Sequence, residues 1–258
     1  MTSAWLSGVV VARDAGEMID ACLASLAGVD ELVVIDHASA DDTAERAARA
    51  GARVVQAPSE ATLGGLRARA HDECRGVWVV FLDADERLPR GGLAALRASL
   101  ARLPESVSAV RLPFDNRLGD VTLRWGGFAP ARRVRAYRRS DCHWASSDRV
   151  HEVLKRLRGR TVCLDTLTVT HLTYRDLAHA EAKLMTYARL GAEAAFEAGR
   201  RPRRVRAVVK ALGRALRDTL LRAAWLDGRA GLRLVWVRAR ATWARELYLA
   251  DLWRRIVR

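Results

Sequence analysis

Three acidic residues, Asp83, Asp85 and Glu86, directly follow an unbroken apolar run at residues 77–82. The run is short, rich in β-branched and aromatic residues, and preceded by Gly76, which is typical of a buried strand. Clustered carboxylates at such a strand end repel one another unless a cation lies between them. The Asp-X-Asp spacing at the carboxyl end of a sheet strand therefore predicts a divalent metal ion that can hold a diphosphate.

The first hundred residues alternate between strand and helix patterns. In order, we predict strand 5–12, helix 17–26, strand 31–35, helix 42–50, strand 53–56, helix 63–74, strand 77–82 and helix 91–103. Repeated β-α units of this length predict a parallel sheet with helices on both faces. Ligands of such a sheet collect where its strands end. Short strand pieces follow up to about residue 170 and predict a mixed continuation of the sheet, and the chain is helical again from Leu177.

Positive charge is concentrated in the last part of the chain. Residues 200–258 hold 17 Lys/Arg against 4 Asp/Glu, a net charge of +13 out of +14 for the whole chain. This segment divides at residues 227–231 into two amphipathic helical stretches rich in Arg and Trp. Such helices are typical of an anionic membrane surface, and the alternative is that they pack on each other with their arginines solvated.

Cysteine spacing and hydropathy argue against a secreted protein and against a membrane-spanning one. The four cysteines show no paired metal-ligand spacing, which favours a reducing, cytoplasmic compartment. We expect no signal peptide, because the first residues run straight into a strand pattern. No uncharged apolar run approaches the roughly 18 residues of a membrane-spanning helix. We therefore expect a soluble or peripheral protein.

The second predicted strand also ends in polar residues, at Asp36, Ser39 and Asp42. Asp36 lies where it could accept hydrogen bonds from a nucleobase or ribose, and we favour ligand contact there. Ser39 and Asp42 could instead cap the following helix, so both roles remain open for them.

In order and spacing, these motifs resemble the family 2 glycosyltransferases, which have the GT-A nucleotide-diphospho-sugar fold. The similarity is strongest to bacterial enzymes that add glucose to the lipopolysaccharide inner core, whose segments read like AKNE, VVDSGSTDGT and LDADE. Further segments match in order, at Gly126-Gly127-Phe128, residues 133–138, Val150-His151-Glu152, residues 171–175 and residues 226–231. The resemblance implies an α/β GT-A fold, Rossmann-like, with a mixed, mostly parallel sheet and a basic helical extension.

The resemblance also implies roles for individual positions. Residues expected to contact the nucleotide sugar are Ala12, Asp14, Asp36, Arg67, Asp83 and Ala84. Asp85 is expected to bind a divalent metal, Mn²⁺ or Mg²⁺, and His171 either completes the metal shell or is a hydrogen-bonded structural histidine. Asp14 stands where the family usually has Asn, His37 where it has Ser, and Asp42 where it has Gly.

The reaction implied is inverting transfer, in which a general base deprotonates an acceptor hydroxyl that attacks the anomeric carbon. Glu152 is our candidate base, with His151 beside it as an orienting or competing group; an ion pair of this segment with Arg149 or Arg156 is the alternative. Trp125, Phe128 and Arg135 are the candidate acceptor contacts. Trp144 is a further candidate for stacking on a sugar ring.

We therefore expect a hexosyltransferase that moves glucose from UDP-glucose to a lipopolysaccharide-core or related membrane-linked glycan. It would lie in the cytoplasm, peripheral on the inner face of the bacterial cytoplasmic membrane, with no nucleic acid as partner. We assign residues 1–175 to the GT-A domain (1–103 nucleotide-binding half, 104–175 acceptor and metal half) and 176–258 to the basic helical region. The alternatives are a sugar-nucleotide nucleotidyltransferase and a non-catalytic polyanion-binding protein.

Overall fold

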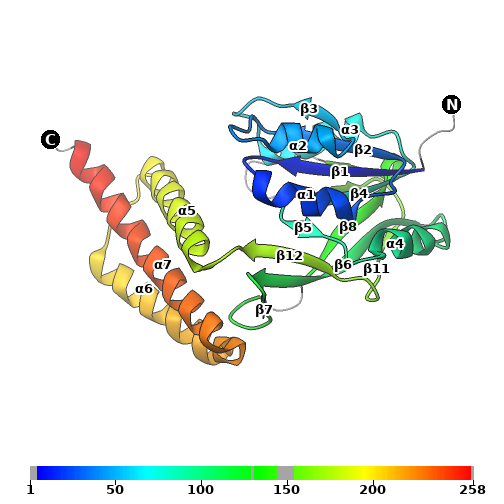
Figure 1. Ribbon diagram of the computed structural model, residues 1–258. Coiled ribbons are helices and arrows are strands. Elements are labelled where there is room, and N and C mark those ends of the chain that lie inside the picture. Colours follow the sequence, from blue (N-terminus) through cyan, green and yellow to red (C-terminus); the bar gives the residue numbers. More distant parts are fainter. Residues whose placement is uncertain (1–4, 129–130, 145–153, 257–258) are drawn as a thin grey trace. The chain divides into compact units, whose positions relative to one another are not determined.

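The computed structural model describes residues 5–128, 131–144 and 154–256 (Figure 1). The chain forms two compact units. The first comprises Met1–Phe114 and Ala131–His171, and the second comprises Asp115–Pro130 and Leu172–Arg258. Because strand β6 (Val107–Leu118) and strand β12 (Val169–Tyr174) each extend past a boundary, both contribute residues to the two units.

The first unit is built on a mixed sheet. Strands β1 (Leu6–Ala12), β2 (Glu31–Asp36), β3 (Arg53–Gln56) and β4 (Trp78–Asp83) pair in parallel in the order β3-β2-β1-β4. Next to β4 the direction reverses: β8 (Arg132–Arg138) is antiparallel to both β4 and β6. Strand β11 (Arg160–Cys163) then pairs with β6 in parallel. The predicted strands of the first hundred residues are therefore confirmed.

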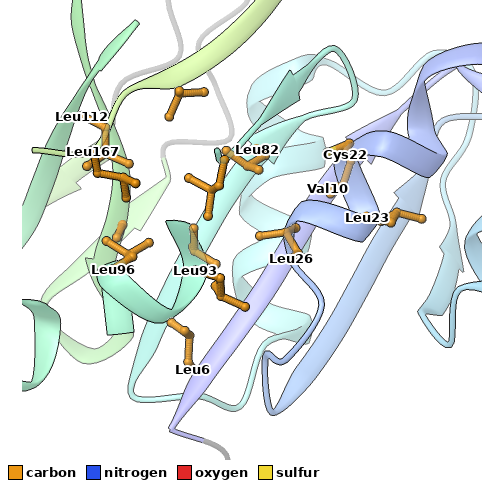
Figure 2. Close-up of a cluster of buried hydrophobic side chains, with 14 of the residues drawn as sticks. Leu6, Val10, Cys22, Leu23, Leu26, Leu82, Leu93, Leu96, Leu112 and Leu167 are labelled. Carbon is orange, nitrogen blue, oxygen red and sulfur yellow. The ribbon is translucent and has the colours of Figure 1, made fainter. Parts of the chain in front are cut away.

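Helices cover both faces of this sheet because its central strands are apolar on both sides. All seven residues of β1 are buried, as expected for a parallel strand enclosed by helices. Leu6 and Val10 share one core cluster with side chains of α1 (Gly16–Ser25), α2 (Thr43–Arg49) and α4 (Gly92–Ala101), part of which Figure 2 shows. Val9 and Val11 face a second cluster with α3 (Leu63–Glu73).

Four short strands were not expected from the sequence. Strand β5 (Glu86–Arg87) follows the acidic motif and pairs antiparallel with β12, so that Glu86 lies opposite His171. Strands β9 (Cys142–Trp144) and β10 (Leu154–Arg156) form a separate two-stranded sheet. Strand β7 (Val121–Leu123) pairs with the end of β6 inside the second unit.

The second unit is mostly helical. It contains α5 (Leu177–Glu197), α6 (Arg204–Leu216) and α7 (Gly228–Ile256), with a π-helical turn at Arg217–Leu221 and a 3₁₀ turn at Ala224–Asp227. The Asp176 side chain caps α5 by accepting a hydrogen bond from the His179 backbone N–H at 2.7 Å. The predicted break in the tail is confirmed, because α7 begins at Gly228. In the described part of the chain, no helix is both long enough and apolar enough to cross a membrane.

The architecture confirms the expected fold class, a GT-A-like α/β fold with a mixed, mostly parallel sheet and a helical C-terminal region. The domain boundaries that we assigned at residues 103 and 175 stay predictions.

One fully buried carboxylate, that of Asp218, holds the end of α6 to α7. Its oxygens lie 3.1–3.6 Å from guanidinium nitrogens of four arginines, namely Arg214, Arg217, Arg222 and Arg238. Three of these lie on α6 and the turns that follow it, and Arg238 lies on α7. A single charge thus compensates several cations, and its removal would leave them to repel one another at close range.

We expect the substitution Asp218→Asn to lower the free energy of unfolding by about 2–3 kcal/mol, because it leaves Arg238, whose side chain is 12% exposed, and three more exposed arginines without their counterion. Urea denaturation followed by circular dichroism measures this change. Asp251→Asn is the matched control, since Asp251 pairs with Arg254 on the exposed side of α7 and should change stability by less than about 0.5 kcal/mol. Equal stability of the two variants would contradict the role of Asp218.

Candidate active site

The carboxyl ends of three parallel strands bring the predicted nucleotide-binding residues to one edge of the sheet. Ala12 at the end of β1 lies opposite Asp36 at the end of β2, and Val11 lies opposite Asp83 at the end of β4. Ala84 follows in the turn after β4 and packs against the first core cluster. Residues that are 47 positions apart in sequence thus lie within two strands of each other, at the edge where ligands of parallel sheets bind.

Side chains tie together the loops that follow β1 and β2. The Asp14 backbone N–H donates to Ser39 Oγ at 3.0 Å, and Asp14 Oδ1 accepts from the Ala40 N–H at 2.7 Å. Ser39 Oγ in turn donates to Asp36 Oδ1 at 2.5 Å. Asp14 and Ala38 both have φ near +50°, which is strained for residues other than glycine and is typical of functional loops.

Asp41, rather than Ser39 or Asp42, holds the start of α2. Asp42 is the N-cap residue, but its side chain makes no capping hydrogen bond. Instead, Asp41 Oδ1 accepts from the Thr43 N–H at 3.1 Å, while Asp41 Oδ2 accepts from the Gly16 N–H at 2.9 Å. The capping alternative for Ser39 and Asp42 is therefore wrong: Ser39 belongs to the Asp14–Asp36 network, and Asp42 forms a surface ion pair with Arg46.

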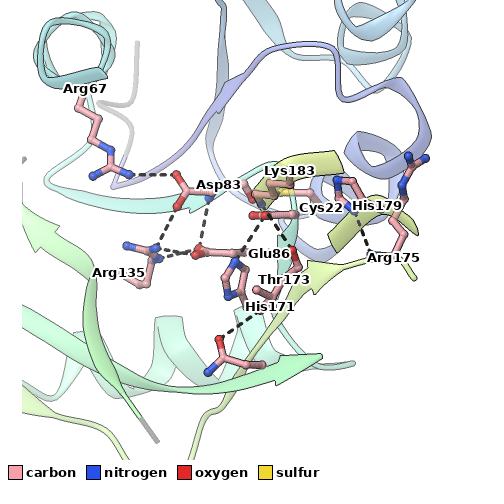
Figure 3. Close-up of polar contacts among 12 residues, drawn as sticks. Cys22, Arg67, Asp83, Glu86, Arg135, His171, Thr173, Arg175, His179 and Lys183 are labelled. Atoms are coloured by element: carbon pink, nitrogen blue, oxygen red, sulfur yellow. Dashed lines mark hydrogen bonds and ion pairs between the residues drawn. The ribbon is translucent and has the colours of Figure 1, made fainter. Parts of the chain in front are cut away.

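The last acid of the motif, Glu86, forms a buried, two-pronged ion pair with Arg135 of β8 (Figure 3). Arg135 Nε and one terminal nitrogen donate to the two Glu86 oxygens at 2.6 and 2.5 Å. The Glu86 side chain is fully buried and that of Arg135 is 5% exposed. Paired hydrogen bonds of this kind fix the geometry of both groups. Glu86 is a site residue that we did not assign from the sequence.

Burial and pairing act in opposite directions on this pair. Burial is the largest influence on Glu86 and raises its pKa, although Arg135 acts to lower it. Burial disfavours the charge of Arg135, yet Glu86 outweighs that effect and the pKa of the guanidinium is raised. We assign an ionised carboxylate at neutral pH, because both of its oxygens accept hydrogen bonds from one guanidinium and a proton on either oxygen would block one of them.

The first acid of the motif, Asp83, lies between two arginines. Its Oδ1 is 3.2 Å from a terminal nitrogen of Arg67 on α3, and its Oδ2 is 3.1 Å from one of Arg135. The Asp83 backbone N–H also donates to Glu86 at 3.2 Å. Asp83 and Arg67, both predicted to contact the nucleotide sugar, thus lie together at the strand end. In this arrangement both oxygens of Asp83 face cations of the protein.

The middle acid, Asp85, points instead to His171 on β12. Asp85 Oδ2 is 3.4 Å from His171 Nε2. One ligand atom from each of Asp85, Glu86 and His171 lies within 4.8 Å of the others. Two carboxylates and an imidazole are ligands for Mn²⁺ or a similar divalent ion. The pairing of β5 with β12 is what brings His171 to a motif 85 residues earlier in the chain.

The three candidate acceptor contacts lie in different parts of the structure, with Arg135 in the first unit and Trp125 and Phe128 in the second. Arg135 is buried against Asp83 and Glu86, so it supports the acidic motif. Phe128, in the second unit, packs against a cluster that includes Tyr174, and its ring meets that of Tyr174 edge to face. Trp125 is 45% exposed, and its backbone N–H is held by Asp227 at 2.9 Å. The candidate bases His151 and Glu152 lie outside the described residues.

Three comparisons place the chain among known proteins. The model of the family "Glycosyl transferase family 2" matches residues 7–159. A TPR repeat-containing protein of Synechococcus elongatus is 34% identical over 119 residues, which are 46% of this chain and 29% of that protein. The chain therefore spans less than a third of the length of this relative.

Solved structures with partial similarity include two proteins. Glucosyl-3-phosphoglycerate synthase from Mycobacterium tuberculosis, solved with Mn²⁺, UDP and glucosyl-3-phosphoglycerate, is 26% identical with a TM-score of 0.40, over 53% of this chain and 57% of that one. S. aureus TarS is 17% identical with a TM-score of 0.45, over 70% of this chain and 39% of that one.

We expect Arg135→Met to lower the free energy of unfolding by about 3–5 kcal/mol, because it leaves the Glu86 carboxylate buried without a partner. Chemical denaturation measures the loss. Arg132→Met on the same strand is the control, since Arg132 is exposed and pairs with an exposed Asp165. Adding Glu86→Gln to Arg135→Met should restore part of the stability. If the loss of stability in the double variant equals the sum of the losses in the two single variants, Glu86 and Arg135 do not act as a pair.

Proposed function

Because the chain belongs to glycosyl transferase family 2, we propose that it is an inverting, metal-dependent hexosyltransferase that uses a UDP-sugar, with glucose as the donated hexose. The single observation that carries the proposal is the group of Asp85, Glu86 and His171 at the end of β4, where a divalent ion would meet a diphosphate. The family match covers β4, the turn after it and β5, which carry Asp85 and Glu86, whereas His171 on β12 lies beyond the matched residues 7–159.

The donor set fits a divalent ion through Asp85 and His171. Both side chains are partly exposed, 20% and 14% respectively, whereas both oxygens of Glu86 accept hydrogen bonds from Arg135. Asp85 and His171 would therefore hold the ion, and Glu86 would set the charge and position of the loop beneath them. The bound ion would offset the negative charge that develops on the leaving diphosphate.

The nucleotide would bind along the edge formed by Ala12, Asp36 and Asp83. The loop network that fixes Asp14 to Ser39 and Ala40 presents a preformed surface there, which reduces the entropy lost on binding. Arg67, oriented by Asp83, would face the diphosphate. Glu152 remains our candidate for the base that deprotonates the acceptor hydroxyl, with His151 beside it, and Trp125 remains a candidate acceptor contact.

We assign the second unit to an anionic membrane surface that carries the acceptor, a lipopolysaccharide-core or related glycan. On α6 the residues Val205, Val209, Leu212 and Leu216 are 61–80% exposed, whereas Ala207 is 1% exposed. The apolar stripe of this helix therefore points away from its packed side. Such a face suits insertion into the interface of a bilayer.

Cations flank the apolar stripe of α6. Arg206 and Lys210 lie about one third of a turn from it on the same helix. Each cation near an anionic bilayer contributes about 1 kcal/mol to binding. Apolar insertion and charge attraction thus act on one surface, and the proposed location is the cytoplasmic face of the inner membrane.

A sugar-nucleotide nucleotidyltransferase is the alternative enzyme, and the family match speaks for transfer of the sugar. The two reactions release different products. A glycosyltransferase releases UDP from UDP-glucose, whereas a nucleotidyltransferase forms or consumes pyrophosphate. Incubation with UDP-glucose and a lipopolysaccharide-core acceptor, followed by chromatography of both products, separates them.

We expect Asp85→Ala to lower the rate of UDP release at least about a hundredfold, because the diphosphate loses its counterion. Calorimetric titration with Mn²⁺ in the presence of UDP should show a matching loss of metal affinity. Asp165→Ala, an exposed aspartate of the same unit, should leave both values unchanged. Undiminished turnover of a folded Asp85→Ala variant would rule out the metal assignment.

We expect the double substitution V209E/L212E to weaken binding to phosphatidylglycerol vesicles at least about tenfold, because it removes two inserting side chains and adds repelled charges. Vesicle co-sedimentation measures this. Leu157→Glu, which changes an equally exposed leucine of the first unit, should have no effect. If the variant binds vesicles normally, or if it instead dissociates a dimer in sedimentation experiments, the surface of α6 serves another partner.

A further inference from the structure

A pocket of about 620 Å³ opens in the first unit between β8, β6, β10 and α3. Among the residues that the structure describes, its walls include six arginines and no acidic residue: Arg67, Arg111, Arg132, Arg133, Arg135 and Arg156. The remaining lining is apolar or weakly polar and includes Val134, Trp144 and Leu154. So many cations around one cavity repel one another unless a negative charge lies among them.

Three of the six arginines are balanced by carboxylates of the protein. Arg67 and Arg135 face Asp83, and Arg135 also holds Glu86. Arg132 lies 2.7 Å from Asp165. Three of the six positive charges are therefore neutralised by carboxylates of the protein. The other three positive charges are not neutralised by these pairs.

The other three arginines, Arg111, Arg133 and Arg156, have no carboxylate partner among the residues that the structure describes. Arg156 donates to the Gly159 carbonyl at 2.9 Å, and Arg133 lies over the Phe114 ring at 5.1 Å. All three are exposed. They come from three different strands, β6, β8 and β10, so sheet geometry rather than local sequence brings them to one pocket.

We propose that Arg111, Arg133 and Arg156 bind a phosphate monoester carried by the acceptor glycan. That the bound glycan is the acceptor rests on the proposed function. A guanidinium matches the oxygens of phosphate with paired, charge-assisted hydrogen bonds. The volume of the pocket exceeds that of phosphate alone and accommodates the sugar that bears it. The pocket shares Arg67 and Arg135 with the acidic motif, so a glycan held there lies beside Asp83 and Glu86.

The pocket thus has two kinds of arginine with separate tasks. Arg67 and Arg135 orient the acidic motif through Asp83 and Glu86, so their removal would disturb the donor side as well. Arg133 and Arg156 contact Phe114 and the Gly159 carbonyl, and within the described chain none of the three arginines pairs with an acid of that motif. Their substitution should therefore affect the acceptor alone, which makes them the residues to test.

Calorimetric titration of the full chain with glucose 6-phosphate, inorganic phosphate and glucose tests the proposal. We expect glucose 6-phosphate to bind more tightly than inorganic phosphate, and glucose not to bind. The variant R133Q/R156Q should weaken glucose 6-phosphate binding at least tenfold, whereas Arg90→Gln, an exposed arginine away from the pocket, should not. UDP affinity in the presence of Mn²⁺ should be the same in all three proteins.

The outcomes separate this proposal from the proposed function. Equal affinity of the wild type and R133Q/R156Q for glucose 6-phosphate would overturn the assignment of the pocket, as would equal binding of glucose 6-phosphate and inorganic phosphate. A loss of UDP affinity in R133Q/R156Q would show that the pocket holds the donor diphosphate instead, which also overturns it. If glucose 6-phosphate binding follows our expectation but no UDP is released from UDP-glucose, the result supports the phosphate-binding assignment of the pocket and contradicts the proposed transferase activity.

Discussion

The ion pair between Glu86 and Arg135 fixes the end of strand β4, and the rest of the candidate site depends on it. A carboxylate and a guanidinium are buried together with two hydrogen bonds between them. Neither charge is tolerable there alone, so the pair holds β5 and β8 in one relative position. Asp83 is oriented by the same guanidinium, and Asp85 is left to face His171. One buried interaction thereby separates three adjacent acids into three environments.

The two units use charge in contrasting ways. In the second unit, the buried Asp218 carboxylate gathers four arginines into a cluster that joins α6 to α7. That cluster fixes which side of α6 is packed, and consequently which side, with its apolar stripe and flanking cations, is exposed. In the first unit, Arg111, Arg133 and Arg156 of the arginine-lined pocket pair with no carboxylate of the described residues, which is the arrangement of a surface that meets an anionic ligand.

Much of the sheet was predictable because its central strands are apolar on both faces and are separated by helices of regular length. The apolar runs at residues 6–12 and 78–83 therefore marked strands β1 and β4 in the sequence itself. The partners of the acidic motif were not predictable in the same way. Arg135 reaches Glu86 from a strand 49 residues later, and a two-residue strand brings His171 beside Asp85. Pairings of this kind depend on register, which local patterns do not contain.

The helical tail shows the same limit. Its periodicity predicted two amphipathic helices and the break between them, and both are present. Periodicity could not decide whether each apolar stripe is buried or exposed, since that depends on what packs against it. The structure exposes the stripe of α6. On α7 it divides the predicted stripe, because Val235 and Ala250 are buried whereas Trp236 and Trp243 are 66% and 45% exposed.

The most direct test of the account is pulsed electron paramagnetic resonance of the protein with Mn²⁺ and UDP. We predict a hyperfine coupling to one directly bound imidazole nitrogen, which disappears in His171→Gln, together with a coupling to phosphorus of the diphosphate. Manganese that shows the phosphorus coupling but no nitrogen coupling in the wild-type protein would contradict a metal site between Asp85 and His171.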